Sequence, residues 1–332
     1  MSFTNTIAIK NRIIGRNAPV FIIAEAGVNH NGDIKLAKKL VDVAVTAGAD
    51  AVKFQTFKTE NLILKKVKKA PYQTQTTDAG ESQFEMLKKL EISYADNLEI
   101  KSYCHQQGII FLTTPFDEES LDEVVSVGVD AIKIASTDLT NIPFLRKVAK
   151  TGLPIFLSTG MSYLAEVQQA VNAIAEYNKS LVLLQCTANY PIEDSEANLA
   201  VLLTYQKHFN CLVGYSDHSV GIGAAPFAVP LGACVVEKHF TLSQDAQGPD
   251  HLASLSPAQL IEFVKLVRQV ERYMGKGIKQ PTLSETLTRQ SLQKSLVALV
   301  DIKEGEYCSS ENISAKRTGG QGISPLYYDD IV

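Results

Sequence analysis

A six-residue pattern decides the fold: it reads GADAVK at residues 48–53, GVDAIK at residues 128–133 and GACVVE at residues 232–237. In each copy a glycine leads into an apolar run of strand length, and a charged residue follows the glycine by five positions. Apolar runs of this kind are typical of parallel strands that are buried on both faces. The pattern therefore places three charged side chains at equivalent positions of three strands.

Short apolar runs rich in Val, Ile or Phe occur eight times along the chain, and amphipathic segments separate them. Asp33 and Gly48 are typical start and stop residues for the first of these helices, and Ser256-Pro257 begins the last. Eight strands that alternate with helices over about 250 residues predict a (β/α)8 TIM barrel. A doubly wound open sheet is the alternative, but its GxGxxG turn is absent after the first run. The runs span residues 21–27, 51–56, 109–116, 131–136, 155–160, 181–186, 212–218 and 233–240.

The repeated pattern also predicts where the charged side chains point. Even-numbered strands of a TIM barrel contribute side chains to the same inward-facing layers. Lys53, Lys133 and Glu237 belong to the second, fourth and eighth runs, so we expect them in one layer near the barrel mouth. Gln55 and His239, two residues further along their strands, should keep the same inward face.

We expect three segments along the chain: a TIM-barrel catalytic domain over residues 1–275, a linker over 276–294 and a small β-rich domain over 295–332. The linker begins after Gly275, where the sequence becomes polar and loses its periodicity. A stretch of about 40 residues buries little core of its own, so the last domain should dock on another surface.

Composition excludes several classes of protein. The chain has 332 residues, of which 45% are hydrophobic and 20% charged, as in ordinary globular proteins. Its net charge of −4 argues against a nucleic-acid binder. It has neither an apolar run of about 20 residues nor a secretory signal pattern, so we expect no membrane partner. Five widely spaced cysteines without a CxxC motif disfavour a disulfide scaffold or a thiolate zinc site, so we expect a cytoplasmic protein.

Polar residues gather at the ends of the predicted strands, where active sites of this fold lie. Buried charges without partners cost several kcal/mol by rough accounting, so packing alone would not retain so many. The set as a whole indicates a catalytic site for small-molecule substrates. It comprises Glu25, Lys53, Gln55, Thr114, Lys133, Ser136, Ser158, Thr159, Thr187, Ser216, Asp217, His218, Glu237 and His239.

Two lysines in one layer predict an anion pocket. Lys53 and Lys133 repel each other unless a phosphate or a carboxylate lies between them, and serine and threonine hydroxyls surround them. One alternative is that each lysine forms a structural ion pair with Glu25 or Glu237. Another is a lysine that forms a Schiff base, as in barrel aldolases.

His218 and His239 end neighbouring strands and could ligate a divalent cation that leaves positions open for substrate. The alternative is a pair of hydrogen-bonded core histidines. His30, in the loop GVNHNGD, is either substrate-facing or solvated. The segment GPDH at residues 248–251 either holds a carboxylate over the mouth or forms a plain turn.

A set of motifs carries a resemblance to one family. They are AEAGVNHNGD (24–33), VKFQTFK (52–58), KAPYQ (69–73), ESQFEMLKKLE (81–91), TPFDEES (114–120), LSTGM (157–161), SDHS (216–219), EKHFTL (237–242) and GPDHLAS (248–254). By these motifs the chain resembles the sialic acid synthases, which condense phosphoenolpyruvate with a 2-acetamido sugar aldehyde. Residues 303–324 resemble the antifreeze-like (SAF) domain of that family.

The resemblance implies a role for each matching residue. Glu25 would orient water or the reacting enol carbon, and His218 and His239 would bind Mn²⁺, with Mg²⁺ or Co²⁺ as alternatives. Arg317 would reach the sugar from the partner chain, because the small domain of the family swaps across a homodimer. Phosphoenolpyruvate would be bound by Lys53, Thr114, Lys133, Ser136, Ser158 and Ser216. The sugar would be bound by Gln55, Asp138, Tyr190, Asp250 and Arg317.

Three features depart from the family pattern. The family often has Ser-Gly-Glu after the fourth strand, whereas this chain has Ser136-Thr137-Asp138, so Asp138 would replace a glutamate with a shorter reach. Ala188 stands where the family often has a polar residue, and Asn189 follows it. The chain ends at Val332, so we expect a truncated small domain.

The implied activity is that of a C–C bond-forming transferase of sialic acid biosynthesis. It would condense phosphoenolpyruvate, N-acetylmannosamine or a related 2-acetamido sugar, and water to an N-acetylneuraminate-type acid and phosphate. An N,N'-diacetyllegionaminate synthase that uses the 2,4-diacetamido-6-deoxy sugar is the first alternative. A Schiff-base aldolase on the same barrel and a non-enzymatic carbohydrate- or ice-binding protein are more distant ones.

Overall fold

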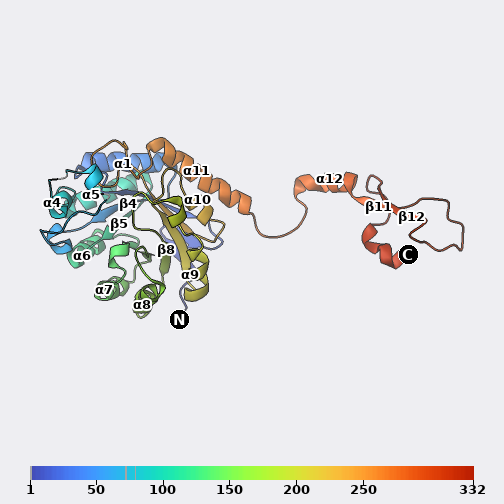
Figure 1. Ribbon diagram of the computed structural model, residues 1–332, viewed down its shortest axis with the longest axis horizontal. Coiled ribbons are helices and arrows are strands. Elements are labelled where there is room, and N and C mark those ends of the chain that lie inside the picture. The colour runs from blue at the N-terminus through green and yellow to red at the C-terminus, as the bar shows by residue number, and fades with distance from the viewer. Residues whose placement is uncertain (1, 72, 79) are drawn as a thin grey trace. The chain divides into compact units, whose positions relative to one another are not determined.

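The computed structural model describes residues 2–71, 73–78 and 80–332 (Figure 1). Tyr72 of the KAPYQ motif lies outside these described residues. The chain divides into two compact units, one that ends at Gly275 and one that begins at Lys276. No helix in the described part of the chain is both long and apolar enough to cross a membrane.

The first unit is a (β/α)8 barrel, so the predicted fold class is confirmed. Its eight strands lie parallel in the order β5-β4-β3-β10-β9-β8-β7-β6, and β5 and β6 pack beside each other, so the ring is nearly closed. The strands are β3 (Phe21–Gly27), β4 (Ala51–Thr56), β5 (Ile110–Pro115), β6 (Ile132–Ile134), β7 (Ile155–Ser158), β8 (Leu181–Gln185), β9 (Leu212–Asp217) and β10 (Val235–His239).

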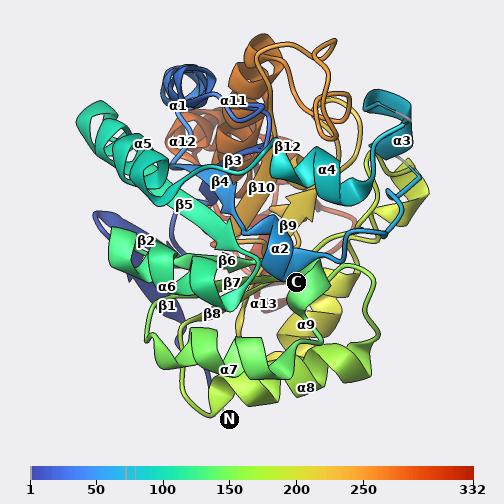
Figure 2. The same cartoon turned by 90° about the vertical axis from the view of Figure 1, so that its left-hand side faces the viewer.

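Helices surround the strands on the outside of the ring (Figure 2). Short helices also occur in the long connection between β4 and α5, at one end of the ring. The helices of this unit are α1 (Ile34–Ala47), α2 (Thr59–Leu62), α3 (Gln73–Thr76), α4 (Gln83–Lys88), α5 (Tyr94–Gln107), α6 (Glu118–Val127), α7 (Ile142–Lys150), α8 (Leu164–Ala175), α9 (Val201–Phe209), α10 (Ala225–Ala228) and α11 (Pro257–Met274).

The helix boundaries follow local chemistry. The Asp33 side chain accepts a hydrogen bond from the Lys35 backbone N–H at the start of α1, and Gly48 ends that helix in the left-handed conformation, with φ of 78°. Ser256 and Gln259 form a capping box at the start of α11, with Pro257 in its first turn. Both boundaries are as predicted from the sequence.

Strand alternation divides the core into two layers. One apolar cluster fills the barrel interior, and a larger one lies between the strands and the helices. A hairpin of β1 (Thr6–Ile9) and β2 (Arg12–Gly15) adds Ile7, Ile9 and Ile14 to the interior cluster, beside residues at the starts of the barrel strands. Apolar side chains therefore fill the amino-terminal end of the barrel, and the polar strand-end residues lie at the opposite, carboxyl-terminal end.

The second unit contains an antiparallel pair, β11 (Lys294–Ala298) and β12 (Ile313–Arg317), with α12 (Leu283–Leu292) before it and α13 (Tyr328–Ile331) after it. The expectation of an unpatterned linker over residues 276–294 is wrong where α12 forms. Thr282 and Glu285 cap this helix reciprocally, and its residues stay exposed, so local capping rather than an apolar stripe marks it.

Candidate active site

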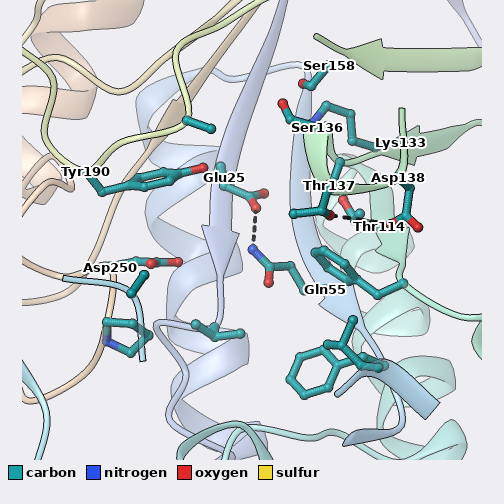
Figure 3. Close-up of a pocket in the computed structure, with 18 of the residues that line it drawn as sticks. Glu25, Gln55, Thr114, Lys133, Ser136, Thr137, Asp138, Ser158, Tyr190 and Asp250 are labelled. Atoms are coloured by element: carbon teal, nitrogen blue, oxygen red, sulfur yellow. Dashed lines mark hydrogen bonds between the residues drawn. The ribbon is translucent and has the colours of Figure 1, made fainter. Parts of the chain in front are cut away.

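A cavity of about 630 Å³ lies at the carboxyl ends of the barrel strands. Figure 3 shows Tyr190 and Asp250 on one wall, facing Lys133 and Ser136 across Glu25. Arg317 belongs to the second unit, where it lies exposed at the end of β12. Every other residue to which the family resemblance assigns a role lines the cavity: Glu25, Lys53, Gln55, Thr114, Lys133, Ser136, Asp138, Ser158, Tyr190, Ser216, His218, His239 and Asp250.

The predicted inward layer brings two lysines and two glutamates together. Lys53 Nζ lies 2.8 Å from Glu25 Oε1 and 3.8 Å from Glu237 Oε1. Lys133 Nζ lies 3.3 Å from the same Glu237 oxygen. Lys53 also donates a hydrogen bond of 3.1 Å to Thr114 Oγ1, and Gln55 donates one of 3.2 Å to Glu25. The ion pairs weighed as an alternative are therefore present, and an anion that enters must compete with these carboxylates.

Burial and ion pairing compete to set the pKa of each group in this layer. Burial dominates at Glu25. It raises the pKa of Glu25 to about 7, with Lys53 opposing and Glu237 reinforcing the shift. At Lys133, burial outweighs the attraction of Glu237 and lowers the pKa. At Lys53, Glu237 and Glu25 outweigh burial and raise the pKa. The two lysines likewise outweigh burial at Glu237 and lower its pKa. Protonation of Glu25 near neutral pH would therefore remove one of the two negative charges that face the lysines.

Four buried polar atoms on the cavity wall have no hydrogen-bond partner among the described residues. They are Glu25 Oε2, Glu237 Oε2, Ser158 Oγ and His239 Nδ1. Leaving a buried polar atom unpaired costs roughly 1–3 kcal/mol, so native proteins seldom retain several in one place without a purpose. Their concentration on one wall indicates a polar ligand that supplies the missing hydrogen bonds.

His218 and His239 lie next to each other, with ring centroids 5.6 Å apart. His218 Nδ1 lies 2.6 Å from the Thr187 carbonyl oxygen, which can only accept, so Nδ1 donates and Nε2 keeps its lone pair. Burial lowers the pKa of His218 to about 4 and that of His239 well below its ordinary value. Both rings are therefore neutral at physiological pH, which is the form that binds metal ions.

The two imidazoles fit a divalent cation as two of its ligands. His239 Nδ1 is one of the buried atoms without a partner, and Asp250 Oδ2 lies 3.8 Å from it. Within the part of the chain that is described, no group of three or more His, Cys, Asp or Glu residues is placed to hold a metal ion. Substrate and water oxygens would have to complete the coordination, as they do at metal sites that act on a substrate.

Tyr190 and Asp250 cover the histidines from the loops. The Tyr190 ring lies 4.1 Å from the ring of His218 and 5.5 Å from that of His239, centroid to centroid. Asp250 is buried, and burial raises its pKa to about 6. Of the two interpretations of the GPDH segment, the structure therefore favours a carboxylate held over the mouth.

The residues that depart from the family pattern also reach the cavity. Asp138 accepts hydrogen bonds from Asn141 Nδ2 at 3.1 Å and from Thr137 Oγ1 at 3.5 Å, and burial raises its pKa. Ala188 lines the cavity, whereas Asn189 is exposed. Asp138 can thus offer a polar group to a ligand, and Asn189 does not replace the polar side chain missing at Ala188.

Three expectations about single residues are corrected. His30 is neither substrate-facing nor solvated: its side chain is fully buried and packs near the ring of Phe54. Thr159 faces away from the cavity and hydrogen-bonds to the Leu184 carbonyl and the Tyr205 hydroxyl. Asp217 also points outward. Alternation along a strand explains the last two, because each follows an inward-facing neighbour by one residue.

The sequence reasoning missed the apolar part of the cavity. Much of it comes from the connection between β4 and α5, and the rest from the loops that follow other strands. Eight of the ten apolar lining residues lie in the motifs quoted above, but nothing in those motifs marked them as part of the cavity, and Leu62 and Ile63 lie outside the motifs. The apolar lining residues are Val28, Phe57, Leu62, Ile63, Ala70, Met86, Leu87, Phe116, Met161 and Pro249.

Fold and site together define a TIM-barrel protein with a pocket at its carboxyl face that is lined by two lysines, two glutamates and two histidines. The chain belongs to the NeuB family, whose model matches residues 40–279. It is 46% identical over 314 residues to the N,N'-diacetyllegionaminic acid synthase of Campylobacter jejuni, covering 94% of each chain. It is 43% identical over 323 residues to the synthase of the same name from Legionella pneumophila, covering 96% of this chain and 90% of that one.

A solved structure supports the same assignment. The N-acetylneuraminic acid (sialic acid) synthetase from Leptospira borgpetersenii, in complex with citrate, matches with a TM-score of 0.76 and 33% identity. The match covers 88% of this chain and 98% of that one. The predicted family is thus confirmed by sequence and by fold.

Proposed function

We propose that this protein is a phosphoenolpyruvate-dependent synthase of nonulosonic acids. It joins phosphoenolpyruvate to the aldehyde of an open-chain 2-acetamido sugar, adds water and releases phosphate. The observation that carries the proposal is the cavity wall on which the ammonium groups of Lys53 and Lys133 lie together with the Ser158 hydroxyl, a buried donor that has no partner among the described residues. Phosphoenolpyruvate offers both a phosphate and a carboxylate to such a wall, and the synthases among the relatives support the reaction class.

The phosphoenolpyruvate end of the cavity combines the two ammonium groups with four hydroxyls. Ser136 Oγ accepts a hydrogen bond of 2.9 Å from the Gly160 N–H and lies 3.1 Å from Cys186 Sγ, so its own hydrogen can turn to an anion when the thiol donates. Ser158 Oγ has no partner among the described residues. Thr114 Oγ1 accepts from Lys53 and so keeps its own hydrogen for an anion, whereas Ser216 Oγ donates to Glu237 and would have to turn away from it to join.

The sugar would occupy the other side, near Gln55, Asp138, Tyr190 and Asp250. The apolar side chains of the cavity suit methyl and N-acetyl groups better than hydroxyls, because burying an unpaired hydroxyl is costly. Together with the names of the two relatives, this favours the 2,4-diacetamido-6-deoxy sugar over N-acetylmannosamine, the reverse of the order expected from the sequence.

His218 and His239 would hold the divalent cation, with Mn²⁺ as the first candidate and Mg²⁺ or Co²⁺ as alternatives. Bound there, the cation would polarise the aldehyde oxygen as a Lewis acid. The neutral state of both rings, which burial enforces, keeps their lone pairs available for it.

The residues of this chain would guide the remaining chemistry. The lysines hold phosphoenolpyruvate while its C3 attacks the aldehyde carbon, so that the C2–C3 π electrons form the new C–C bond and the aldehyde oxygen takes a proton from solvent to become a hydroxyl. Water adds to C2, and the partnerless oxygen of Glu25 accepts its proton. The tetrahedral adduct then loses phosphate by cleavage of the C2–O bond and leaves a 2-keto acid. Lys53 and Lys133 offset the anionic charge throughout, as preorganised groups that need not reorient.

A phosphate-release assay with Mn²⁺ tests this proposal. The protein should release phosphate from phosphoenolpyruvate only when a sugar is present, and kcat/KM should be at least about tenfold higher for the 2,4-diacetamido-6-deoxy sugar than for N-acetylmannosamine. Absence of phosphate release with both sugars would contradict the synthase proposal. Covalent trapping by borohydride with pyruvate would instead support the Schiff-base aldolase.

We also propose that the second unit acts as the antifreeze-like cap of a domain-swapped homodimer. In that arrangement Arg317 would approach the sugar in the barrel of the partner chain. Its exposure at the end of β12 supports this, because an exposed guanidinium is accessible to a partner.

A further inference from the structure

A second buried ion pair lies behind the cavity wall. Asp217 and Lys238 are register partners on β9 and β10. The residues immediately before them, Ser216 and Glu237, are also register partners, and their side chains face the cavity. Lys238 Nζ lies 3.2 Å from Asp217 Oδ2, and both side chains are 0% exposed. A pair this deep loses the hydration of both charges, so stability alone is a weak reason to retain it.

This pair fastens the residue that follows His218. Lys238 Nζ donates a hydrogen bond of 2.5 Å to the carbonyl oxygen of Ser219. Asp217 Oδ1 accepts from the Ser219 backbone N–H at 2.9 Å and from its hydroxyl at 2.6 Å. Asp217 Oδ2 accepts from the Ala225 N–H at 2.9 Å, which ties in the start of α10. We call Asp217, Ser219 and Lys238 the outer clamp.

Gly223 closes the loop tightly over the outer clamp. Its φ is 66°, in the left-handed region, and a Cβ there would lie 2.1 Å from Ser219 Oγ and 2.8 Å from Lys238 Nζ. Only glycine fits this approach without displacing the clamp. The loop after β9 is therefore held against the outer face of the barrel rather than left free at the mouth.

The hydrogen bonds of His218 itself link it to the chain that follows β8. Its Nδ1 donates to the Thr187 carbonyl, and its own carbonyl accepts a hydrogen bond of 3.0 Å from the Ile192 N–H. The outer clamp fixes the chain immediately before and after His218. We propose that the outer clamp is a positioning device that aims His218 Nε2 into the cavity, where the proposed function, on which this inference rests, needs a cation ligand.

The test compares Lys238→Met with a matched control at the opposite end of the barrel. Arg268 Nη2 lies 2.7 Å from Asp50 Oδ2, and that carboxylate also accepts from a backbone N–H, but the pair is remote from the cavity. Mn²⁺ affinity is measured from the electron paramagnetic resonance signal of free Mn²⁺, without turnover, alongside thermal midpoints and steady-state kinetics.

Lys238→Met should raise the Kd for Mn²⁺ by about 10- to 100-fold, the usual effect of losing a group that orients a ligand. It should lower kcat more than it raises the KM for phosphoenolpyruvate. Arg268→Met should lower the thermal midpoint but change the Kd for Mn²⁺ by less than about twofold, because the sites are independent. Equal changes in Mn²⁺ affinity for the two variants would overturn the inference, since a merely structural pair predicts them.

Ser219→Ala keeps the test decisive if Lys238→Met does not fold. It removes only the hydroxyl contacts and should still raise the Kd for Mn²⁺ by at least about threefold; an unchanged Kd would refute the positioning role. A wild-type protein that binds no Mn²⁺ would overturn this inference together with the metal part of the proposed function. Wild-type binding that Lys238→Met and Ser219→Ala both leave intact would overturn this inference alone.

Discussion

His30 offers a quantitative prediction about stability. Its side chain is fully buried in the loop after β3, its Nδ1 accepts a hydrogen bond of 3.0 Å from the Gly32 N–H, and its Nε2 has no partner among the described residues. Burial lowers the pKa of His30 from 6.5 to about 4. The folded protein therefore holds the ring neutral over a range in which the unfolded chain binds a proton.

The size and sign of the effect follow from linkage. A pKa lowered from 6.5 to about 4 corresponds to about 3 kcal/mol of unfolding free energy. The folded pKa lies below the unfolded one, so this contribution is fully present above pH 6.5 and is lost as the pH falls toward 4. About 2.5 kcal/mol of it should be gone at pH 4.5. His30→Gln cannot titrate and should lack this loss.

The pH dependence of the unfolding free energy can be measured by denaturant unfolding, followed by far-UV circular dichroism at several pH values. The stability difference between wild type and His30→Gln should shrink by about 2–3 kcal/mol between pH 7 and pH 4.5, with contributions of all other groups cancelling. His105→Gln, at an exposed position in the last turn of α5, is the surface control and should change the unfolding free energy at pH 7 by no more than about 0.5 kcal/mol. A difference for His30→Gln that stays constant over this pH range would refute the reasoning.

Three further predictions concern the site. His218→Ala and His239→Ala should abolish Mn²⁺-dependent phosphate release while the circular dichroism spectrum stays native, and full activity of either variant in chelator-treated buffer would refute the metal assignment. Lys133→Met should raise the KM for phosphoenolpyruvate by roughly 10- to 100-fold, the loss expected for one charge-assisted contact, whereas Lys53→Met should also lower the thermal midpoint, because it leaves the buried Glu25 without its cation while Glu237 keeps Lys133. Arg317→Ala should raise the KM for the sugar more than that for phosphoenolpyruvate, and an unchanged sugar KM would contradict the swapped cap.

The barrel and its charged layer were predictable because each rests on a local rule. Alternating runs of strand length indicate a parallel barrel, and the common spacing from glycine to Lys53, Lys133 and Glu237 places those side chains on one face. The distances among them follow from barrel geometry rather than from the sequence itself. Whether the lysines pair with glutamates or wait for an anion could not be predicted, because both outcomes use the same residues at the same positions.

Other features escaped the sequence because they depend on which side of a strand or loop faces the cavity. Asp217 was counted among the strand-end polar residues, yet its side chain points outward, since successive side chains along a strand point to opposite faces of the sheet. His30 lies in a polar loop but is buried by long-range packing against Phe54. The apolar wall draws on a connection without regular periodicity. The helix α12 was not predicted because none of its residues is buried, so its sequence has no apolar stripe. The capping box of Thr282 and Glu285 is the signal that could have indicated it.

The same alternation links chemistry to architecture on β9 and β10. Inward-facing Ser216 and Glu237 hydrogen-bond at 3.0 Å and hold the lysine layer, while their outward-facing neighbours form the outer clamp. A one-residue slip between these strands would exchange the two faces and move both charged sets at once. The buried pair behind the wall therefore resists a change of register that would dismantle the site in front of it. The retention of Asp217 and Lys238 as desolvated charges on the outer face is explained if they keep Ser216 and Glu237 in register on the inner face.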